Sequence, residues 1–173
     1  HLCNSYYRKY DIPLVILRYF NSYGPRQDAS DYGGVVSIFM RRVLRDQPPQ
    51  VHGDGKQTRC FTFISDIIDG TISSIVRSEA VCQVFNVGNP LEIAIAELAT
   101  AILRVAGKDR DLRPEFIPYQ GFYGHFYEDI RRRVPDISKA ERLLGFKPKV
   151  PLEKGLRLTF QWYQEQFRQA PAS

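Results

Sequence analysis

The stretch Leu14-Val15-Ile16-Leu17-Arg18-Tyr19-Phe20-Asn21-Ser22-Tyr23-Gly24-Pro25 decides the fold class. Its first four residues are apolar and include two β-branched side chains, which is typical of a strand buried on both faces of a parallel sheet. The stretch then becomes polar and aromatic, and its final Gly-Pro indicates a loop. In open α/β sheets, ligands bind beyond the carboxyl ends of the strands. We therefore expect this strand to deliver polar side chains to a site, namely Arg18, Tyr19, Asn21 and Tyr23.

The bulk composition is that of an ordinary globular protein. The chain has 173 residues, of which 43% are hydrophobic and 25% are charged. No apolar run reaches the ~18 residues that span a bilayer, so we expect no membrane partner. The three cysteines are widely spaced, which predicts reduced thiols, a cytoplasmic location and no metal site. The chain begins at His1 and its one methionine is Met40, so we expect a processed chain or a fragment.

The positive charge favours small phosphorylated ligands over nucleic acid. The formal net charge is +5. The excess cations stand in short groups, Arg41-Arg42 and Arg131-Arg132-Arg133, rather than along one basic face interleaved with aromatic residues. We therefore expect no nucleic-acid partner.

Periodic patterns predict alternating helices and short strands, which indicates an α/β fold. The Ser138–Glu141 segment reads as a capping box, and Gly145 as the stop of the same helix. The other expected helices are the tail 1–10, one from 35 to the Pro48-Pro49 pair, one from about 66 to 76, one from 95 that ends at Gly107, and a last one from Pro151. The expected strands are 14–19, 50–52, 60–64, 84–87 and about 115–117.

Two groups of arginines are candidates for binding phosphate. Arg59 follows the turn Gly53-Asp54-Gly55-Lys56, where glycine suits a positive φ. The second group is Arg131-Arg132-Arg133. The planar fork of arginine binds two phosphate oxygens at once. From spacing alone, two interpretations stay open: solvated surface charges, or two sites that converge on a diphosphate.

Five ordered sequence blocks resemble the C-terminal half of the NAD-dependent epimerase/dehydratase family. These are extended short-chain dehydrogenases that act on nucleotide-diphosphate sugars, and the chain looks most like a UDP-glucose 4-epimerase. The blocks are Arg18-Tyr19-Phe20-Asn21-x-Tyr23-Gly24-Pro25, Gly53-Asp54-Gly55-x-Gln57-Thr58-Arg59-x-Phe61 with Asp66, Phe85-Asn86-Val87-Gly88, Arg132-Arg133-x-Pro135-Asp136-Ile137-Ser138-Lys139-Ala140 with Leu143-Leu144-Gly145-Phe146-x-Pro148, and Leu152-Glu153-x-Gly155-Leu156.

The resemblance implies the C-terminal remnant of a Rossmann-type parallel sheet plus the smaller mixed α/β substrate-binding lobe. About 1–24 and 84–107 would belong to the dinucleotide-binding sheet and its adjoining helix. About 25–83 and 108–173 would form the substrate-binding lobe.

The resemblance also implies roles for individual residues. Tyr19 would lie beside the nicotinamide end of NAD. Arg59 would bind the phosphates together with Arg132, for which Arg131 is an alternative. His52 stands where relatives more often place a Tyr or Phe ring on the base. The implied substrate-binding positions are Asn21 (diphosphate), Val35 and Val36 (backbone of the nucleotide pocket), Gln50 and His52 (base), and Arg59 and Arg132 (phosphates).

Two motifs of the family are missing from the sequence. It contains neither the Gly-x-x-Gly-x-x-Gly loop that binds NAD nor the catalytic Tyr-x-x-x-Lys pair, whose four-residue step places both side chains on one helix face. We expect both upstream of His1, so NAD would be bound mainly by that missing half. The fragment alone would then be inactive, and the full-length protein would be a homodimer.

The leading hypothesis is therefore the substrate-binding portion of an NAD-dependent nucleotide-sugar epimerase. It would clamp the nucleotide diphosphate for hydride transfer at the sugar. The alternatives are a nucleotide-sugar dehydratase fragment, a UDP-glucuronate decarboxylase fragment, and a non-catalytic nucleotide-sugar binding module.

Overall fold

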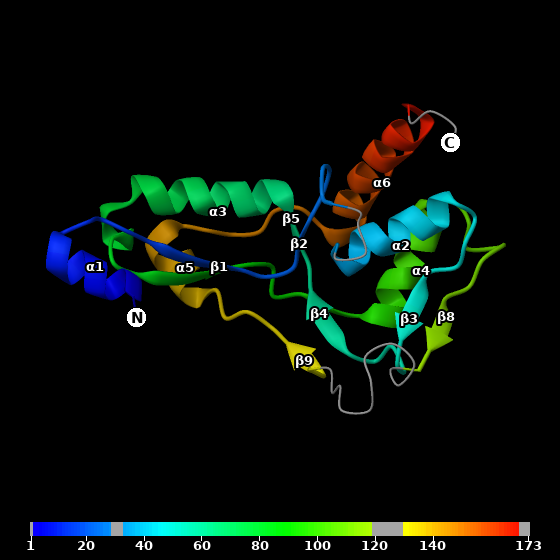
Figure 1. Cartoon of the computed structure of the whole chain (residues 1–173), viewed down its shortest axis with the longest axis horizontal. Coiled ribbons are helices and arrows are strands. Elements are labelled where there is room, and N and C mark those ends of the chain that lie inside the picture. Colours follow the sequence, from blue (N-terminus) through cyan, green and yellow to red (C-terminus); the bar gives the residue numbers. More distant parts are fainter. Residues whose placement is uncertain (1, 29–32, 119–129, 170–173) are drawn as a thin grey trace. The chain divides into compact units, whose positions relative to one another are not determined.

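The structure is a computed structural model that describes residues 2–28, 33–118 and 130–169, with short strands and helices alternating along the chain (Figure 1). The helices are α1 (Leu2–Tyr10), α2 (Val35–Leu44), α3 (Ile64–Val76), the 3-10 turn η1 (Ser78–Ala80), α4 (Ile95–Val105), α5 (Ser138–Leu144) and α6 (Leu152–Gln169). The strands are β1 (Ile16–Tyr19), β2 (Ser22–Tyr23), β3 (Gln50–His52), β4 (Thr58–Cys60), β5 (Thr62–Phe63), β6 (Val84–Val87), β7 (Glu92–Ala94), β8 (Glu115–Ile117) and β9 (Arg132–Arg133).

The chain divides into two compact units. Unit 1 comprises 1–22, 60–91 and 135–150, and unit 2 comprises 23–59, 92–134 and 151–173. In this division α3 and α5 belong with the β1–β6 sheet, and α4 belongs to unit 2. The expected division into a dinucleotide-binding sheet and a substrate-binding lobe stays a prediction. Within the described residues, no helix has both the length and the apolar character needed to cross a membrane.

Unit 1 is built on the parallel pair β1–β6, whose register sets Ile16 beside Val84 and Tyr19 beside Val87. Helices α3 and α5 contact each other, and α5 packs on β6. The buried cluster between them consists of Ile67, Ala80, Phe85, Val87, Ile137, Ala140, Leu144 and Phe146, with Val15, Leu17, Ile64 and Leu143 packed against it. The apolar runs of the sequence thus form this core, as expected from their hydrophobicity.

Strand β1 is less buried than the sequence predicted. Ile16 and Leu17 are partly buried, and Arg18 and Tyr19 are exposed. In the described part of the chain β1 pairs with β6 in a two-stranded sheet, so its outer edge and part of its surface stay uncovered. The parallel pairing was predicted correctly, and the burial on both faces was wrong.

The capping box predicted for α5 is also wrong. The helix begins at Ser138, so Ile137 rather than Ser138 is the N-cap residue, and it makes no side-chain capping hydrogen bond. Instead, Asp136 Oδ1 accepts a hydrogen bond from the Ser138 amide at 2.9 Å. Asp136, which directly precedes the N-cap residue, thus supplies an acceptor for one of the N–H groups that have no partner within the helix. The predicted stop is confirmed, since Gly145 adopts a left-handed φ of 67°.

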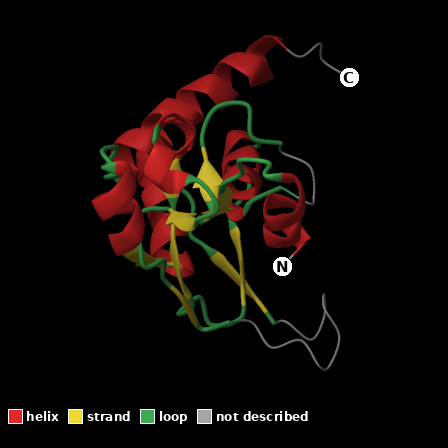
Figure 2. Ribbon diagram, turned by 90° about the vertical axis from the view of Figure 1, so that its left-hand side faces the viewer, coloured by secondary structure: helices red, strands yellow, loops and turns green. Residues whose placement is uncertain are grey.

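In unit 2, three helices contact one another and carry two small sheets (Figures 1 and 2). Helices α2, α4 and α6 pack together, and α4 also contacts β3 and β7. The parallel pair β3–β8 sets His52 beside Ile117. The three-stranded sheet has the order β7-β4-β9. The buried side chains of the helices include Phe39, Met40, Leu98, Ile102, Leu156 and Phe160.

Candidate functional site

The parallel strands β4 and β9 carry the arginines that the sequence predicted for phosphate binding. In their register Thr58 lies beside Arg132, and Arg59 lies beside Arg133. Residues paired across neighbouring strands point to the same face of a sheet, and successive residues point to opposite faces. Arg59 and Arg133 therefore share one face, while Thr58 and Arg132 share the other.

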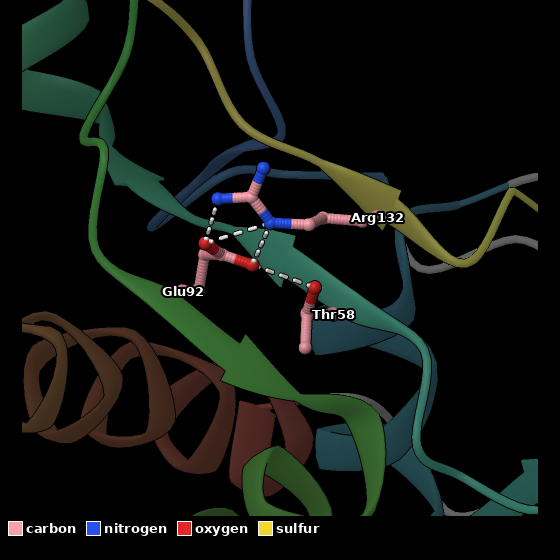
Figure 3. Close-up of polar contacts among 3 residues, drawn as sticks. All are labelled: Thr58, Glu92 and Arg132. Carbon is pink, nitrogen blue, oxygen red and sulfur yellow. Dashed lines mark hydrogen bonds and ion pairs between the residues drawn. The ribbon is translucent and has the colours of Figure 1, made fainter.

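Two carboxylates bind the other arginines of this segment. Arg131 Nη1 lies 2.8 Å from Asp54 Oδ2. Arg132 Nη2 lies 2.6 Å from Glu92 Oε1, and its Nε lies 3.1 Å from Oε2 (Figure 3). The hydrogen bonds from the arginines hold the pKa of Asp54 and the pKa of Glu92 below their usual values, because they favour the ionised acceptor. Both contacts are therefore ion pairs at neutral pH.

Arg59 is held by backbone carbonyls. Its Nη1 donates to Thr58 O at 2.8 Å and to Ile130 O at 2.6 Å. A guanidinium presents five N–H donors in a fixed plane, and both of these bonds use one nitrogen. The contact with Ile130 also joins the side chain to the segment that leads into β9. The guanidinium is thus oriented by the backbone on both sides of the β4–β9 pair.

The backbone conformation of the turn between β3 and β4 accounts for its two glycines. Gly53 and Gly55 have φ values of 74° and 69°, a region that side chains rarely adopt. A Cβ at Gly55 would lie 2.9 Å from side-chain atoms of both Val51 and Ala96, so the position is also closed to a side chain by crowding. The turn holds Asp54 where it meets Arg131.

The base-binding positions predicted on β3 lie on one face of that strand. Gln50 and His52 are two residues apart, so their side chains point the same way. Gln50 Nε2 donates to Glu115 Oε2 at 3.0 Å, and the His52 carbonyl accepts from Gln57 Nε2 at 3.0 Å. The second bond links β3 to the residue just before β4.

The ionisation of His52 should make the stability of the fold depend on pH. Burial lowers the pKa of His52 from its ordinary 6.5, so the unfolded chain binds this proton more readily than the folded chain. The contribution of His52 is therefore present above about pH 6.5 and is lost as the pH falls toward the lowered folded pKa. We expect His52→Gln to remove this loss, because glutamine takes up no proton. Urea unfolding of both proteins at pH 7.5, 6.5 and 5.5 measures the difference, and parallel pH profiles would contradict the assignment.

Val35 and Val36 open helix α2, as predicted. The helix is preceded by Gly34 in an extended conformation, and no side chain caps that residue. Val36 is buried and Val35 is partly buried. The backbone N–H groups of a first helical turn have no partners within the helix and favour negative charge. Val35 and Val36 thus lie at a helix start with backbone N–H groups available, and their place in a nucleotide pocket stays a prediction.

Asn21 and Tyr19 lie in unit 1, at the carboxyl end of β1. The Asn21 backbone has a positive φ of 39°, which asparagine tolerates better than most residues. Its Nδ2 donates to Cys60 O at 2.8 Å, and an amide nitrogen has a second N–H. The half-exposed Tyr19 shares a hydrogen bond of 3.0 Å between its hydroxyl and that of Thr71.

The structure thus groups some of the predicted residues. Within unit 2, Gln50 and His52 share β3, and Arg59 lies on a strand paired with that of Arg132, although their side chains take opposite faces. The meeting of these groups with Asn21 over one ligand stays a prediction. Sequence reasoning missed Thr58 and Glu92 because the Glu92–Arg132 contact joins residues 40 positions apart, and no local motif marks it.

The comparisons with known proteins bear on the family of the chain rather than on the roles of single residues. The family model described as GDP-mannose 4,6 dehydratase matches residues 1–159. A UDP-N-acetyl-alpha-D-glucosaminuronate decarboxylase of Bacillus cytotoxicus is 37% identical over 154 residues, which are 89% of this chain and 47% of that protein.

Solved structures are similar over nearly the whole chain. The UDP-glucose 4-epimerase of Thermotoga maritima with UDP-glucose has a TM-score of 0.86 and 30% identity over 96% of this chain. The UDP-glucuronic acid 4-epimerase of Bacillus cereus, in complex with UDP-glucuronic acid and NAD, has a TM-score of 0.83 and 31% identity over 96%. The chain spans 50% of each of these proteins, so it corresponds to about half of their length.

These similarities confirm the predicted fold class, a mixed α/β fold whose parallel strands match part of a Rossmann-like epimerase. They also confirm the resemblance seen in the five sequence blocks. The protein belongs to the family of the GDP-mannose 4,6-dehydratase model, the NAD-dependent nucleotide-sugar epimerases and dehydratases among the extended short-chain dehydrogenases.

Proposed function

We propose that this chain binds the nucleoside diphosphate of a UDP-sugar within an NAD-dependent enzyme. The observation that carries the proposal is the register of β4 and β9, which sets two arginines, Arg59 and Arg133, side by side on one face. Neighbouring strands are about 4.8 Å apart, so the two arginines extend from adjacent backbone positions on that face. A diphosphate placed between them would relieve their repulsion and accept several charge-assisted hydrogen bonds.

The choice of the second phosphate arginine follows from the same geometry. The sequence favoured Arg132, with Arg131 as the alternative. Each of these has a carboxylate partner, Glu92 or Asp54, and Arg132 lies on the face opposite Arg59. We therefore assign the second phosphate contact to Arg133.

The base is assigned to β3, with the side chains of Gln50 and His52 on one face. The lowered pKa of His52 keeps its ring neutral at physiological pH, and a neutral ring is a suitable surface for stacking on a base. The first turn of α2, at Val35 and Val36, offers backbone N–H groups to the nucleotide. These assignments are supported by neighbours that hold UDP-sugars, such as the epimerases with UDP-glucose and UDP-glucuronic acid.

The cofactor is assigned through Tyr19. The side chain is half exposed at the carboxyl end of a parallel strand, where ligands of α/β folds bind, so it fits a position beside the nicotinamide. When bound, NAD supplies the hydride acceptor. What this chain contributes is to bind the nucleotide and to orient the sugar for that transfer, which lowers the entropic part of the barrier.

The reaction of the intact enzyme is proposed as epimerisation of the sugar. The solved structures reported above favour it, since both are 4-epimerases. Decarboxylation of a UDP-uronic acid is the second candidate, because the bacterial relative at 37% identity is a decarboxylase. Incubation of the intact enzyme with UDP-glucuronic acid separates the two, since one reaction gives an isomer of equal mass and the other releases carbon dioxide.

Calorimetric titration of the 173-residue chain with UDP and with uridine tests the binding proposal. We expect UDP to bind at least about tenfold more tightly than uridine, because the diphosphate brings charge-assisted hydrogen bonds. A single-stranded oligonucleotide should compete poorly. Equal affinity for UDP and uridine would contradict the phosphate site, and tight oligonucleotide binding with a steep salt dependence would favour a nucleic-acid function.

A further inference from the structure

Glu92 connects the three strands of the unit 2 sheet through its side chain (Figure 3). It stands on β7 and accepts a hydrogen bond from Thr58 Oγ1 on β4, at 2.9 Å from Oε2. The same carboxylate receives Arg132 of β9 through Nη2 at 2.6 Å and through Nε at 3.1 Å. Both oxygens of Glu92 are thus engaged, and each contact reaches a different strand.

This network has the features of a surface ion pair that contributes to the stability of the local structure. An isolated exposed pair contributes little, but a bidentate arginine–carboxylate contact within a network contributes more. The Glu92 side chain is 30% exposed, compared with 70% for Arg132. Strand β9 consists of two residues, so few backbone bonds hold it beside β4. The Glu92 tie therefore adds to the Arg131–Asp54 ion pair and the hydrogen bond from Arg59 to Ile130 O in fixing the place of this segment.

The position of β9 decides how the two arginines of the opposite face are arranged. Thr58 and Arg132 are in register and both bind Glu92, and the next pair in the same register is Arg59 with Arg133. Because successive residues alternate between faces, fixing the first pair on one face fixes the second pair on the other. The carboxylate acts on the proposed phosphate site through the backbone, without touching it.

A carboxylate close to an anion site would by simple electrostatics weaken binding. Removing its charge would then strengthen the affinity for a diphosphate. A carboxylate that instead holds the arginines in place gives the opposite sign, since its removal loosens the pair that contacts the ligand. The two roles can thus be distinguished by the direction of one change.

We infer that Glu92 is a positioning residue for the diphosphate site, which it holds in shape by tying β9 to β4 through Arg132 and Thr58. This inference rests on the proposed function, because the ligand is the UDP assigned above. It concerns a residue whose contacts with Thr58 and Arg132 lie on the face opposite Arg59 and Arg133.

The central experiment compares UDP affinity in Glu92→Gln and Glu97→Gln by calorimetry. Both variants remove one negative charge from the same unit. Glu97 accepts a hydrogen bond from the Ala94 amide at 3.2 Å, a contact that glutamine can also make. We expect Glu92→Gln to weaken UDP binding roughly tenfold, the scale of one ion pair that holds a ligand contact, and Glu97→Gln to leave it within about twofold. Unchanged or tighter binding by Glu92→Gln would overturn the inference.

Arg132→Gln supplies the second arm. If Arg132 acts by its pair with Glu92, its loss weakens UDP binding as much as Glu92→Gln does, and the double variant is no weaker than either single one. If Arg132 binds phosphate directly, its loss is severe while Glu92→Gln has no such effect. That result overturns the positioning role and restores Arg132 as the ligand residue.

Amide hydrogen exchange separates this inference from the proposed function. The Thr58 amide donates to Arg131 O at 2.9 Å, so its protection reports whether β9 stays paired with β4. We expect its exchange to speed up at least about tenfold in Glu92→Gln and to stay unchanged in Glu97→Gln. If the wild-type chain fails to bind UDP, the proposed function is wrong, and the exchange at Thr58 still reports whether Glu92 holds β9. Unchanged exchange in Glu92→Gln would show that it does not.

Discussion

Phe85→Ala is expected to lower the free energy of unfolding by about 3–5 kcal/mol, the usual cost of removing a buried phenylalanine. Phe85 is fully buried on β6, in the middle of the unit 1 core. Its ring also lies 5.0 Å from Lys139 Nζ, a cation–π contact that alanine cannot make. Deleting the ring loses its transfer free energy and leaves a cavity between β6, α3 and α5.

Urea unfolding followed by circular dichroism measures this loss. Because it approaches the whole stability of an ordinary domain, Phe85→Leu serves as the milder companion, with a loss of about 1–2 kcal/mol. The matched control is Phe167→Ala on α6, where the residue is 49% exposed. We expect that variant to lose less than about 1 kcal/mol. Equal losses at the two positions would mean that Phe85 is not part of a packed core.

The local patterns of the sequence predicted most of the elements. The apolar runs 14–17 and 84–87 lie in or next to the parallel strands β1 and β6, and the periodic stretch from Ile95 forms α4. Gly145 ends its helix in the left-handed conformation. Each of these features depends on residues close together in the chain, which is why the sequence alone could indicate them.

Features that depend on which of several nearby side chains is used, or on distant residues, were predicted less well. The start of α5 uses Asp136 rather than the expected box, since two nearby side chains compete for the same backbone donors. The low burial of β1 depends on which segments lie beside it in the sheet, and a run of apolar residues does not predict those neighbours. The spacing of apolar residues is a property of one segment, whereas the burial of that segment depends on the other segments packed against it.

The candidate site shows the same division. The sequence identified Arg59 and the group Arg131-Arg132-Arg133 as candidate phosphate ligands, with solvated surface charges as the alternative. Which of the three consecutive arginines faces Arg59 is a matter of strand register, and a shift by one residue exchanges the faces. The register of β4 with β9, and the carboxylates that bind Arg131 and Arg132, became visible in the structure.

Arg59→Ala is expected to weaken the binding of UDP by roughly 10- to 150-fold, or about 1.5–3 kcal/mol, the scale of a hydrogen bond to a charged group. The guanidinium is oriented by two carbonyl contacts before any ligand arrives, so little entropy is lost when it binds phosphate. Arg59→Lys should recover part of the affinity, because lysine keeps the charge and loses the planar fork.

The control for charge is Arg157→Ala on α6, whose guanidinium pairs with Glu153 one helical turn away at 3.2 Å. It removes the same charge from the same unit at an exposed position, so we expect UDP affinity to change by less than about twofold. Calorimetry at two salt concentrations completes the test, because a general electrostatic effect fades with salt in both variants. If Arg59→Ala binds UDP as the wild type does, Arg59 is not a phosphate ligand, and the β4–β9 face loses its assigned role. If only Arg59→Ala is impaired and the loss persists at high salt, the effect belongs to a directed contact rather than to the net charge of +5.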